Sequence, residues 1–486
     1  MSTGDSVAAD VVAAEDVLLF VNAATASTGQ REFHTDAADQ AMSLEFLHEY
    51  MLVNYRELYA ATLALGINDH NATLVIRRLL ATGRHATAEQ KRAEGALIAR
   101  RLLVLPPPRV FRLFKALQRD GVNNRRTRAI VRDWTLALEG PAYHAVKYRS
   151  GFKAGLKHAH IDIGDGELRD FLFGPLKRKP YQTPLLESWR QAHYNSGALY
   201  RLPYTVAEGF AAKHGIDRAA FLERIGDRMT PWEKLRAGEE PPEPLDPLEL
   251  ASGGAKYCGP PQPWLTRLAV RILAMPLDER ADRRAELTRA LRNFAAHEAG
   301  ALAGTWGRVT AVLDDSFSSF GSPVKRRRPL AVALACHFLL EALAAPGRYT
   351  PLWVSGRDDP LLVHPGGATP LGLRLVDALE TAPERIVVVS DGWDNSPPGL
   401  AGEVLRVWRA RLDPAGRVDV VHVNPVFDAR ALDVRALSRA VPSVGIRDAE
   451  DLVPLVELAQ FAQGRVGLPE LMAYLDGRVR RFLGAD

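Results

Sequence analysis

The last third of the chain carries two carboxylates and three hydroxyls at positions where they could meet around a cation: Asp314, Ser316, Ser318, Thr369 and Asp391. The first three form the pattern D-x-S-x-S after an apolar run at residues 308–313, and the last follows a second apolar run at 386–389. Such runs are typical of buried strands, and open α/β sheets hold ligands at the carboxyl ends of their strands. Oxygen groups suit a hard cation such as Mg²⁺. The alternative is that the serines only cap a helix and Asp391 only begins a turn.

The elements that must position these residues alternate between strand and helix after residue 301. The expected strands are residues 308–313, 350–354, 386–389, 418–423 and 444–446. The expected helices are residues 330–344, 371–380, 402–411, 449–463 and 469–483. This alternation predicts a doubly wound, mostly parallel sheet in a domain of residues 301–486.

The motif pieces together resemble the metal-ion-dependent adhesion site of von Willebrand factor A domains, whose fold is Rossmann-like. The resemblance implies that Mg²⁺ or Mn²⁺ is bound, directly or through water, by Asp314, Ser316, Ser318, Thr369 and Asp391. It also implies a coordination position that a partner's carboxylate completes.

The first 300 residues have a different pattern. Residues 1–40 are acidic and rich in alanine, and they contain one candidate strand at 18–21. Residues 41–300 are predicted to form successive helices with short links, except for a long Pro-rich loop at 240–263. Helix pairs joined in this way predict an α-solenoid of HEAT-like repeats.

Positive charge is concentrated in one part of the chain. The net charge of the 486 residues is only +4, yet residues 109–157 hold twelve Lys and Arg against three acids. Such asymmetry indicates a surface for a polyanion. The sequence has neither the pattern of a signal peptide nor that of a membrane span, and Cys258 and Cys336 are too few for a disulfide framework. We therefore expect a cytoplasmic protein with Cys336 in an apolar core helix.

Two predicted helices in this region have one basic and one apolar face each. The basic residues are Arg112, Lys115 and Arg119, then Arg125, Arg128 and Arg132. The apolar stripes are Val110, Leu113, Phe114 and Leu117, then Ile130, Trp134 and Leu138. We expect the basic faces to contact phosphates; a merely solvated charged face is the alternative. Nearby aromatic residues could stack on bases or belong to the core: Tyr143, Tyr148, Tyr181, Trp189 and Tyr194.

The run FKALQRDGVNNRRTRAIVRDWTLALEGPAYHAVKYRSGFKAGLKHAH, residues 114–160, resembles the TROVE module of Ro autoantigen proteins. The later run HVNPVFDARALDVRALSRAVPSVGIRDAEDL resembles the end of bacterial Ro-type proteins. This resemblance implies a ring of HEAT-like helices followed by a von Willebrand A-like domain. It implies binding of single-stranded ends of misfolded or noncoding RNA, and of Y-like RNA, with Lys147, Arg149 and His160 as further RNA contacts.

Enzymatic function is not expected, because the sequence contains no phosphate-binding loop, dinucleotide fingerprint, nucleophile elbow or zinc-protease motif. The histidines of the basic region lack metal-ligand spacing, so RNA contact or packing is expected of them: His144, His158, His160 and His193. The basic run at residues 325–328 is either a contact for a polyanion or partner, or a solvated helix start.

The sequence thus predicts a monomeric, non-catalytic RNA-binding ribonucleoprotein component. An exoribonuclease or another protein is the expected partner at the metal site. One alternative is a Mg²⁺-dependent protein-interaction scaffold that binds no RNA. A nuclease subunit is the less favoured alternative, because the carboxylate cluster fits an adhesion site.

Overall fold

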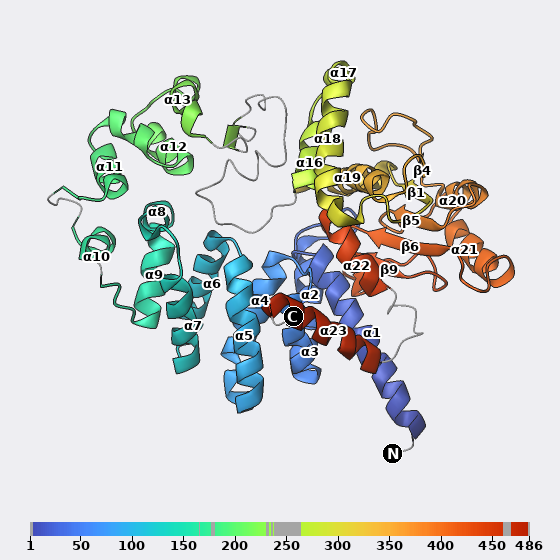
Figure 1. Ribbon diagram of the computed structural model, residues 1–486, viewed down its shortest axis with the longest axis horizontal. Helices are drawn as coiled ribbons and strands as arrows, with labels where there is room; N and C mark the ends of the chain where they lie inside the picture. The colour runs from blue at the N-terminus through green and yellow to red at the C-terminus, as the bar shows by residue number, and fades with distance from the viewer. Residues whose placement is uncertain are drawn as a thin grey trace. The chain divides into compact units, whose positions relative to one another are not determined.

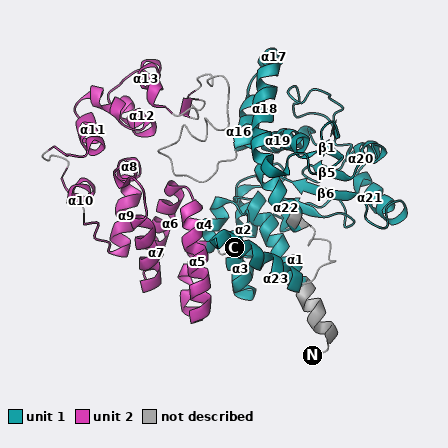
Figure 2. Cartoon of the chain, in the orientation of Figure 1, with its two compact units in different colours: residues 1–75, 261–486 teal, residues 76–260 magenta. Residues whose placement is uncertain are grey.

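The computed structural model describes residues 3–164, 166–175, 180–229, 233, 234, 237, 264–459 and 468–484. The chain forms two compact units: residues 1–75 with 261–486, called unit 1, and residues 76–260, called unit 2 (Figure 2). These units do not follow the predicted domain boundaries after residues 40 and 300, because the N-terminal residues and residues 261–300 belong to the unit that contains the sheet. The Pro-rich segment and Cys258 lie outside the described residues.

Unit 1 is built on a five-stranded parallel sheet with the order β4-β1-β5-β6-β9 (Figure 1). The strands are β1 Val309–Leu313, β4 Tyr349–Trp353, β5 Arg385–Val389, β6 Asp419–Asn424 and β9 Ser443–Gly445. Each predicted strand is confirmed to within one residue at either end. Two small hairpins accompany the sheet: β2 Gly321–Ser322 with β3 Lys325–Arg326, and β7 Phe427–Asp428 with β8 Asp433–Val434.

Helices cover both faces of the sheet. The chain leaves β1 for β4 through α19 (Arg328–Leu343), then passes to the other side of β1 through α20 (Leu371–Glu380) and on through α21 (Leu400–Arg411). Because crossovers are right-handed, this reversal places α19 opposite α20 and α21. Val312 and Val388 therefore share a core with Leu375 and Leu405. Cys336 is fully buried in α19, as predicted.

The helix α1 (Thr3–Ala26) replaces the strand predicted at residues 18–21, so that prediction is wrong. The run is long, rich in alanine and free of proline, which favours a helix over a strand. Its residues Val17, Phe20 and Val21 are fully buried. Asn22 donates to Asp433 on β8 (3.1 Å) and accepts from the Gly445 amide on β9 (2.9 Å), so the N-terminal helix is bound to the last strands.

The remaining helices of unit 1 are α2 Ala37–Asn54, α3 Arg56–Ala61, α16 Trp264–Ala274, α17 Leu277–Asp282, α18 Arg284–Ala299, α22 Leu452–Ala459 and α23 Leu468–Leu483. α16 and α18 pack against α19, whose apolar residues are buried on all sides. This packing explains why residues 264–299 belong with the sheet. A helix was predicted at residues 449–463. The structure has a 3₁₀ turn at Ala449–Asp451 followed by α22, and residues 460–463 lie outside the described part.

Unit 2 consists of consecutive helices after α4 (Asp69–Ala81), which spans the unit boundary. They are α5 Ala88–Val104, α6 Pro107–Arg119, α7 Arg125–Leu136, α8 Pro141–Lys147, α9 Arg149–Ala159, α10 Gly166–Phe173, α11 Pro184–Ala192, α12 Tyr204–Lys213 and α13 Arg218–Ile225. Local signals begin several of them: Thr87 and Gln90 form a capping box for α5, and Asn124 caps α7. α9 packs on α6 closely enough that a Cβ at Gly151 would lie 2.6 Å from the Cβ of Phe111.

Candidate cation site and basic helix faces

The predicted ligands meet at the carboxyl ends of β1 and β5, the strands between which the sheet order reverses. Three backbone hydrogen bonds join the loops that carry them. The Asp314 amide donates to the carbonyl of Val389 (3.0 Å), the Phe317 amide to that of Gly367 (3.2 Å), and the Asn395 amide to that of Thr369 (3.3 Å). This reversal point is where doubly wound sheets bind ligands.

The candidate ligands are mostly withdrawn from solvent. Asp314, Ser316, Thr369 and Asp391 are each at most 4% exposed, and Ser318 is half-buried. Ser316 donates its amide to Asp314 Oδ1 (2.9 Å), and its Oγ lies 3.4 Å from Ser318 Oγ. The Ser316 hydroxyl thus faces the Ser318 hydroxyl, and within the described structure it makes no capping bond to the 3₁₀ turn Phe317–Phe320.

The electrostatics of the two aspartates fit a cation. Burial raises the pKa of Asp314, and the nearby Asp391 carboxylate raises it further. A divalent cation between two buried carboxylates would remove this repulsion. Among the described residues no three His, Cys, Asp or Glu side chains form a metal-binding group. A cation here would therefore depend on hydroxyl oxygens as well as the two carboxylates, which is a donor set that suits Mg²⁺ or Mn²⁺.

Three supporting residues were missed in the sequence. Asp315 is fully buried, accepts from the Ser355 amide (2.9 Å), and pairs with Arg357 (2.8 Å). Asn395 Oδ1 accepts from the Thr369 amide (2.9 Å) and so orients that loop. His34 Nε2 lies 3.6 Å from Asp391 Oδ2. Asp315 is next to the predicted ligand Asp314 in the sequence, and Asn395 follows Asp391 by four residues, whereas no pattern in the sequence points to His34.

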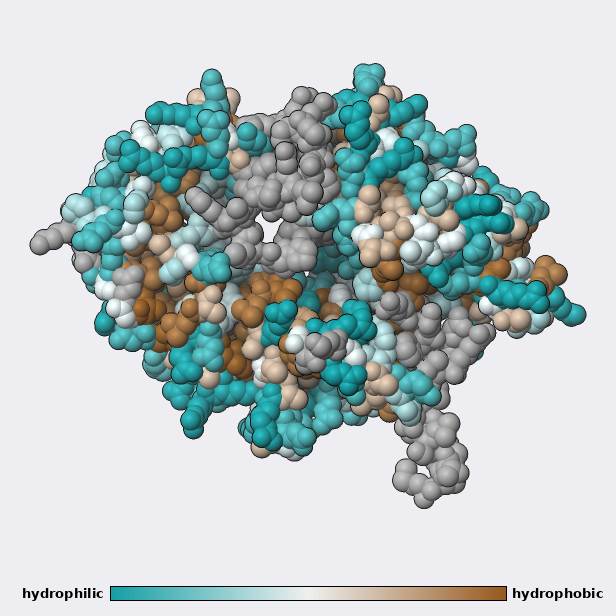
Figure 3. Space-filling view, in the orientation of Figure 1, coloured by the Kyte–Doolittle hydropathy of each residue, from teal (hydrophilic) through white to brown (hydrophobic). Residues whose placement is uncertain are grey.

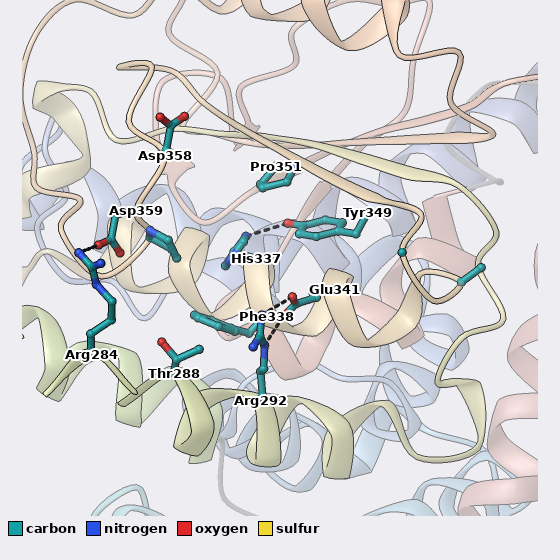
Figure 4. Close-up of a pocket in the computed structure, with 13 residues that line it drawn as sticks. Arg284, Thr288, Arg292, His337, Phe338, Glu341, Tyr349, Pro351, Asp358 and Asp359 are labelled. Atoms are coloured by element: carbon teal, nitrogen blue, oxygen red, sulfur yellow. Dashed lines mark hydrogen bonds and ion pairs between the residues drawn. The ribbon is translucent and has the colours of Figure 1, made fainter. Parts of the chain in front are cut away.

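A cavity of about 580 Å³ lies elsewhere in unit 1, between α18, α19 and β4 (Figure 4). Its arginines are paired: Arg292 with Glu341 (2.8 Å), and Arg284 with Asp359. His337 contacts the hydroxyl of the half-buried Tyr349 (3.0 Å), and burial lowers the pKa of His337 to about 4. The cavity therefore does not present its arginines to an anion.

The two predicted basic faces are both exposed on unit 2. All six side chains are solvent-accessible: Arg112, Lys115 and Arg119 on α6, and Arg125, Arg128 and Arg132 on α7. The predicted apolar stripe of α6 is buried in full. The stripe of α7 needs a correction: Ile130 and Leu138 are half-buried, and Val131 is buried with Trp134. The Trp134 ring packs edge-on against both Phe111 and Phe114 (5.3 Å between centroids), and this contact determines which side of α7 faces inward.

The few acids near these faces are already engaged. Asp120 pairs with Arg77 and Arg119, and Asp133 pairs with Arg132 (2.9 Å). The Arg132–Asp133 pair is more than half exposed on both sides, so it holds the arginine only weakly. On the face seen in Figure 3, hydrophilic residues cover much of the surface, and apolar residues occur in groups among the hydrophilic ones.

The three further RNA-contact candidates are placed differently from one another. Lys147 donates to the Tyr143 hydroxyl (3.0 Å) and is half-buried. Arg149 donates to the carbonyls of residues 171 (2.8 Å) and 172 (3.2 Å), and its guanidinium lies 5.4 Å from the Trp189 ring centroid. His160 is exposed at the end of α9 with φ of 53°. Arg149 is thus used for packing, and its RNA contact stays a prediction.

Most of the aromatic and histidine residues that could contact RNA are at least partly buried in the fold. Among the candidate aromatics, Tyr194 is 67% exposed and the others are half-buried. His158 is hydrogen-bonded to the carbonyl of Val122 (3.0 Å), and His193 packs against Trp189 (4.5 Å between centroids). Burial lowers the pKa of His144 and of His193.

The basic run at residues 325–328 lies at the start of α19, as one of the two alternatives predicted, but only Arg326 is exposed to solvent. Contact with a polyanion or partner stays a prediction. Lys325 pairs with the buried Glu32, Arg327 donates to the carbonyl of Leu273, and Arg328 pairs with Asp448. The run therefore joins neighbouring elements of unit 1.

No family model matches the sequence, and no curated protein matches it. The two family resemblances therefore stay predictions that rest on the residues themselves. None of the helices in the described ranges has both the length and the apolar sequence that crossing a bilayer requires.

Proposed function

We propose that the chain is a non-catalytic RNA-binding protein of the Ro type, which holds single-stranded ends of noncoding or misfolded RNA, and Y-like RNA, in RNA quality control or degradation. The observation that carries this proposal is the pair of exposed basic faces on α6 and α7. Exposed Lys and Arg in this density are the electrostatic footprint of a nucleic-acid surface.

The spacing of these residues supports a phosphate contact. On each helix the basic residues recur after three and then four positions, so they follow one face over about 10 Å of helix axis. The apolar residues opposite them are buried against neighbouring helices. The basic side chains are therefore held in a row by a packed core, and the row is available to a flexible polyanion.

The finer description of the fold is part of the same proposal. Consecutive packed helices in unit 2 support a HEAT-like repeat region of the TROVE kind. The meeting of three ligand-bearing loops at the reversal of strand order supports a von Willebrand A-like domain with an adhesion site. That site would hold Mg²⁺ or Mn²⁺ and bind a carboxylate of an exoribonuclease or another protein.

A Mg²⁺-dependent protein-interaction scaffold is the second candidate. It is favoured by two aromatic residues on the turn Phe317–Phe320, which also carries the candidate ligand Ser318, because Phe317 is 62% exposed and Phe320 is 38% exposed. Aromatic residues are enriched in protein interfaces relative to the rest of the surface.

A filter-binding assay with a labelled single-stranded RNA of mixed sequence distinguishes the two proposed functions. The RNA reading predicts saturable binding that weakens with salt and is stronger for single-stranded RNA than for duplex. The protein-scaffold reading becomes the better one if no binding is measured at low salt while the protein is folded.

A further inference from the structure

A second, smaller cavity of about 190 Å³ lies in unit 1. It is bordered by residues 273–280, by the start of α19 and by the loop at residues 363–365. Seven of the ten residues that line it are leucine, methionine, proline or valine, and the other three are Arg280, Arg327 and His364. The described residues around this cavity therefore combine an apolar wall with two guanidinium groups and include no carboxylate.

Arg280 brings a positive charge to the cavity wall, although only 4% of the residue is exposed. Its Nη1 donates to the carbonyls of Leu361 (2.9 Å) and Val363 (3.0 Å), and these bonds hold the guanidinium in place. Its Nε is buried and has no hydrogen-bond partner in the described structure. Asp359, the acid whose charge raises the pKa of Arg280, is itself paired with Arg284. Because buried charges are normally paired, Arg280 lacks the counter-charge that its position calls for.

Arg327 brings a second positive charge to the same cavity. It is half-buried, its Nη1 donates to the carbonyl of Leu273, and no acid in the described ranges pairs with it. Burial lowers the pKa of Arg280, and the nearby charge of Arg327 lowers it further. Both groups stay charged, because arginine is not deprotonated in proteins. The first turn of α19, which lines the cavity through Leu330, adds the positive end of a helix dipole.

We propose that this cavity binds a small aliphatic monocarboxylate, with its carboxylate held by Arg280 and Arg327 and its carbon chain against the apolar wall. The planar guanidinium fork matches the two oxygens of a carboxylate. A phosphate is a poorer fit, because an apolar wall offers no donor to its further oxygens. The cavity has room for on the order of six water molecules at about 30 Å³ each, which suits an acid of about four to six carbon atoms.

The larger cavity of unit 1 does not have this property, because each of its arginines is already paired with a carboxylate. The inference is also independent of the proposed RNA and cation functions. No residue that lines the smaller cavity is a candidate cation ligand, and none lies on the basic faces of α6 and α7. A failure of either proposal would therefore leave the carboxylate site untouched.

The test is a calorimetric titration of the full chain with sodium 4-methylpentanoate at low salt. Leu277 lines the cavity and is 42% exposed, so it offers a matched pair of variants that spares the core. Leu277→Glu places a negative charge beside the bound carboxylate and should weaken binding about tenfold, whereas Leu277→Lys should keep or raise the wild-type affinity. Arg327→Gln removes a charged hydrogen bond and should weaken binding at least about tenfold. The control Leu373→Glu, at an exposed position of α20, should stay within about threefold of wild type.

Three further titrations test the class of ligand. The amide 4-methylpentanamide keeps the carbon skeleton and lacks the charge, inorganic phosphate has charge and no carbon chain, and a tripeptide that ends in leucine carries its carboxylate on a longer body. We expect all three to bind at least about tenfold more weakly than 4-methylpentanoate, because each lacks the charge, the apolar body or the small size.

Several results would overturn the inference. If the folded wild-type chain does not bind 4-methylpentanoate at millimolar concentration, or if the two Leu277 variants bind it equally, the carboxylate does not lie at this cavity. Equal affinity for the amide would mean that the arginines do not recognise the ligand. Tighter binding of phosphate would make this a general anion site, and tighter binding of the tripeptide would assign it to the end of a protein chain.

Discussion

Reversing the charge of the α7 face offers a quantitative prediction for RNA binding. The change is Arg125→Glu, Arg128→Glu and Arg132→Glu in one protein. All three side chains are exposed, and the buried residues Val131 and Trp134 are untouched. Arg125 is the first residue of α7, where a glutamate suits the helix dipole better than an arginine. The fold should therefore tolerate the change.

The expected size of the effect follows from counterion release. Each phosphate contact on a single strand contributes about −0.7 to the slope of log K against log[salt]. If each of the three arginines neutralises one phosphate, their loss should flatten the slope by about 2 and weaken binding for all sequences alike. His160 should matter more for RNA with a free single-stranded end than for duplex.

Fluorescence anisotropy of a labelled single-stranded RNA across a salt series measures this slope. A charge-matched control reverses Arg411, Arg430 and Arg439, which are exposed in unit 1. Each reversal changes the charge by two, so both triple variants go from +4 to −2. The control should keep the wild-type slope. Equal slopes for all three folded proteins, or an equal loss in the control, would show that α7 does not contact RNA.

The other predictions concern the cation site and stability. Asp314→Ala should abolish Mg²⁺ binding in calorimetry and leave the helical unit folded by circular dichroism; an unchanged Mg²⁺ affinity would refute the site. Gly151→Ala should destabilise unit 2 by about 1–2 kcal/mol in denaturant, because its Cβ would meet a phenylalanine at 2.6 Å and the overlap outweighs the helix propensity gained. Gly209→Ala in α12, where a Cβ meets nothing within 4 Å, should stabilise it by up to about 1 kcal/mol, and the reverse order would contradict the packing. Burial raises the pKa of Glu450 to about 7, so the stability that this proton adds is present below pH 4.5 and lost as pH rises through 7. Glu450→Gln should remove up to about 3 kcal/mol of that pH dependence, whereas the exposed control Glu380→Gln should not alter it.

Much of the sheet could be predicted because its signals are local. Three of the five strands, β1, β5 and β6, are short runs rich in β-branched residues between turns, and parallel strands place their carboxyl ends at one edge. The same argument predicted that Asp314 and Asp391 would lie together, and the backbone bonds between their loops agree. The side of α7 that is buried was misjudged by one residue, because Ile130 and Val131 are both apolar and only the contacts of Trp134 distinguish them.

The parts that could not be predicted depend on contacts between distant residues. Which helices belong to the unit that contains the sheet is decided by α19, because α16 and α18 pack against it. No periodicity in the sequence reveals that choice. The position of α1 depends on bonds between Asn22 and strands near the other end of the chain. The contact of His34 with Asp391 likewise joins residues that are far apart in the sequence. Arg149 matched a basic pattern, yet its bonds to two carbonyls and its place over Trp189 are tertiary contacts.

The central claim is that the basic helices of unit 2 hold RNA, and photo-crosslinking tests it most directly. The full chain is crosslinked to a single-stranded RNA that contains 4-thiouridine, and the modified peptides are identified by mass spectrometry. The account predicts crosslinks concentrated in α6 and α7, residues 107–136, and a loss of those in α7 in the Arg125/Arg128/Arg132 variant. Crosslinks confined to the sheet and its helices at 264–459, or none at saturating RNA, would contradict it.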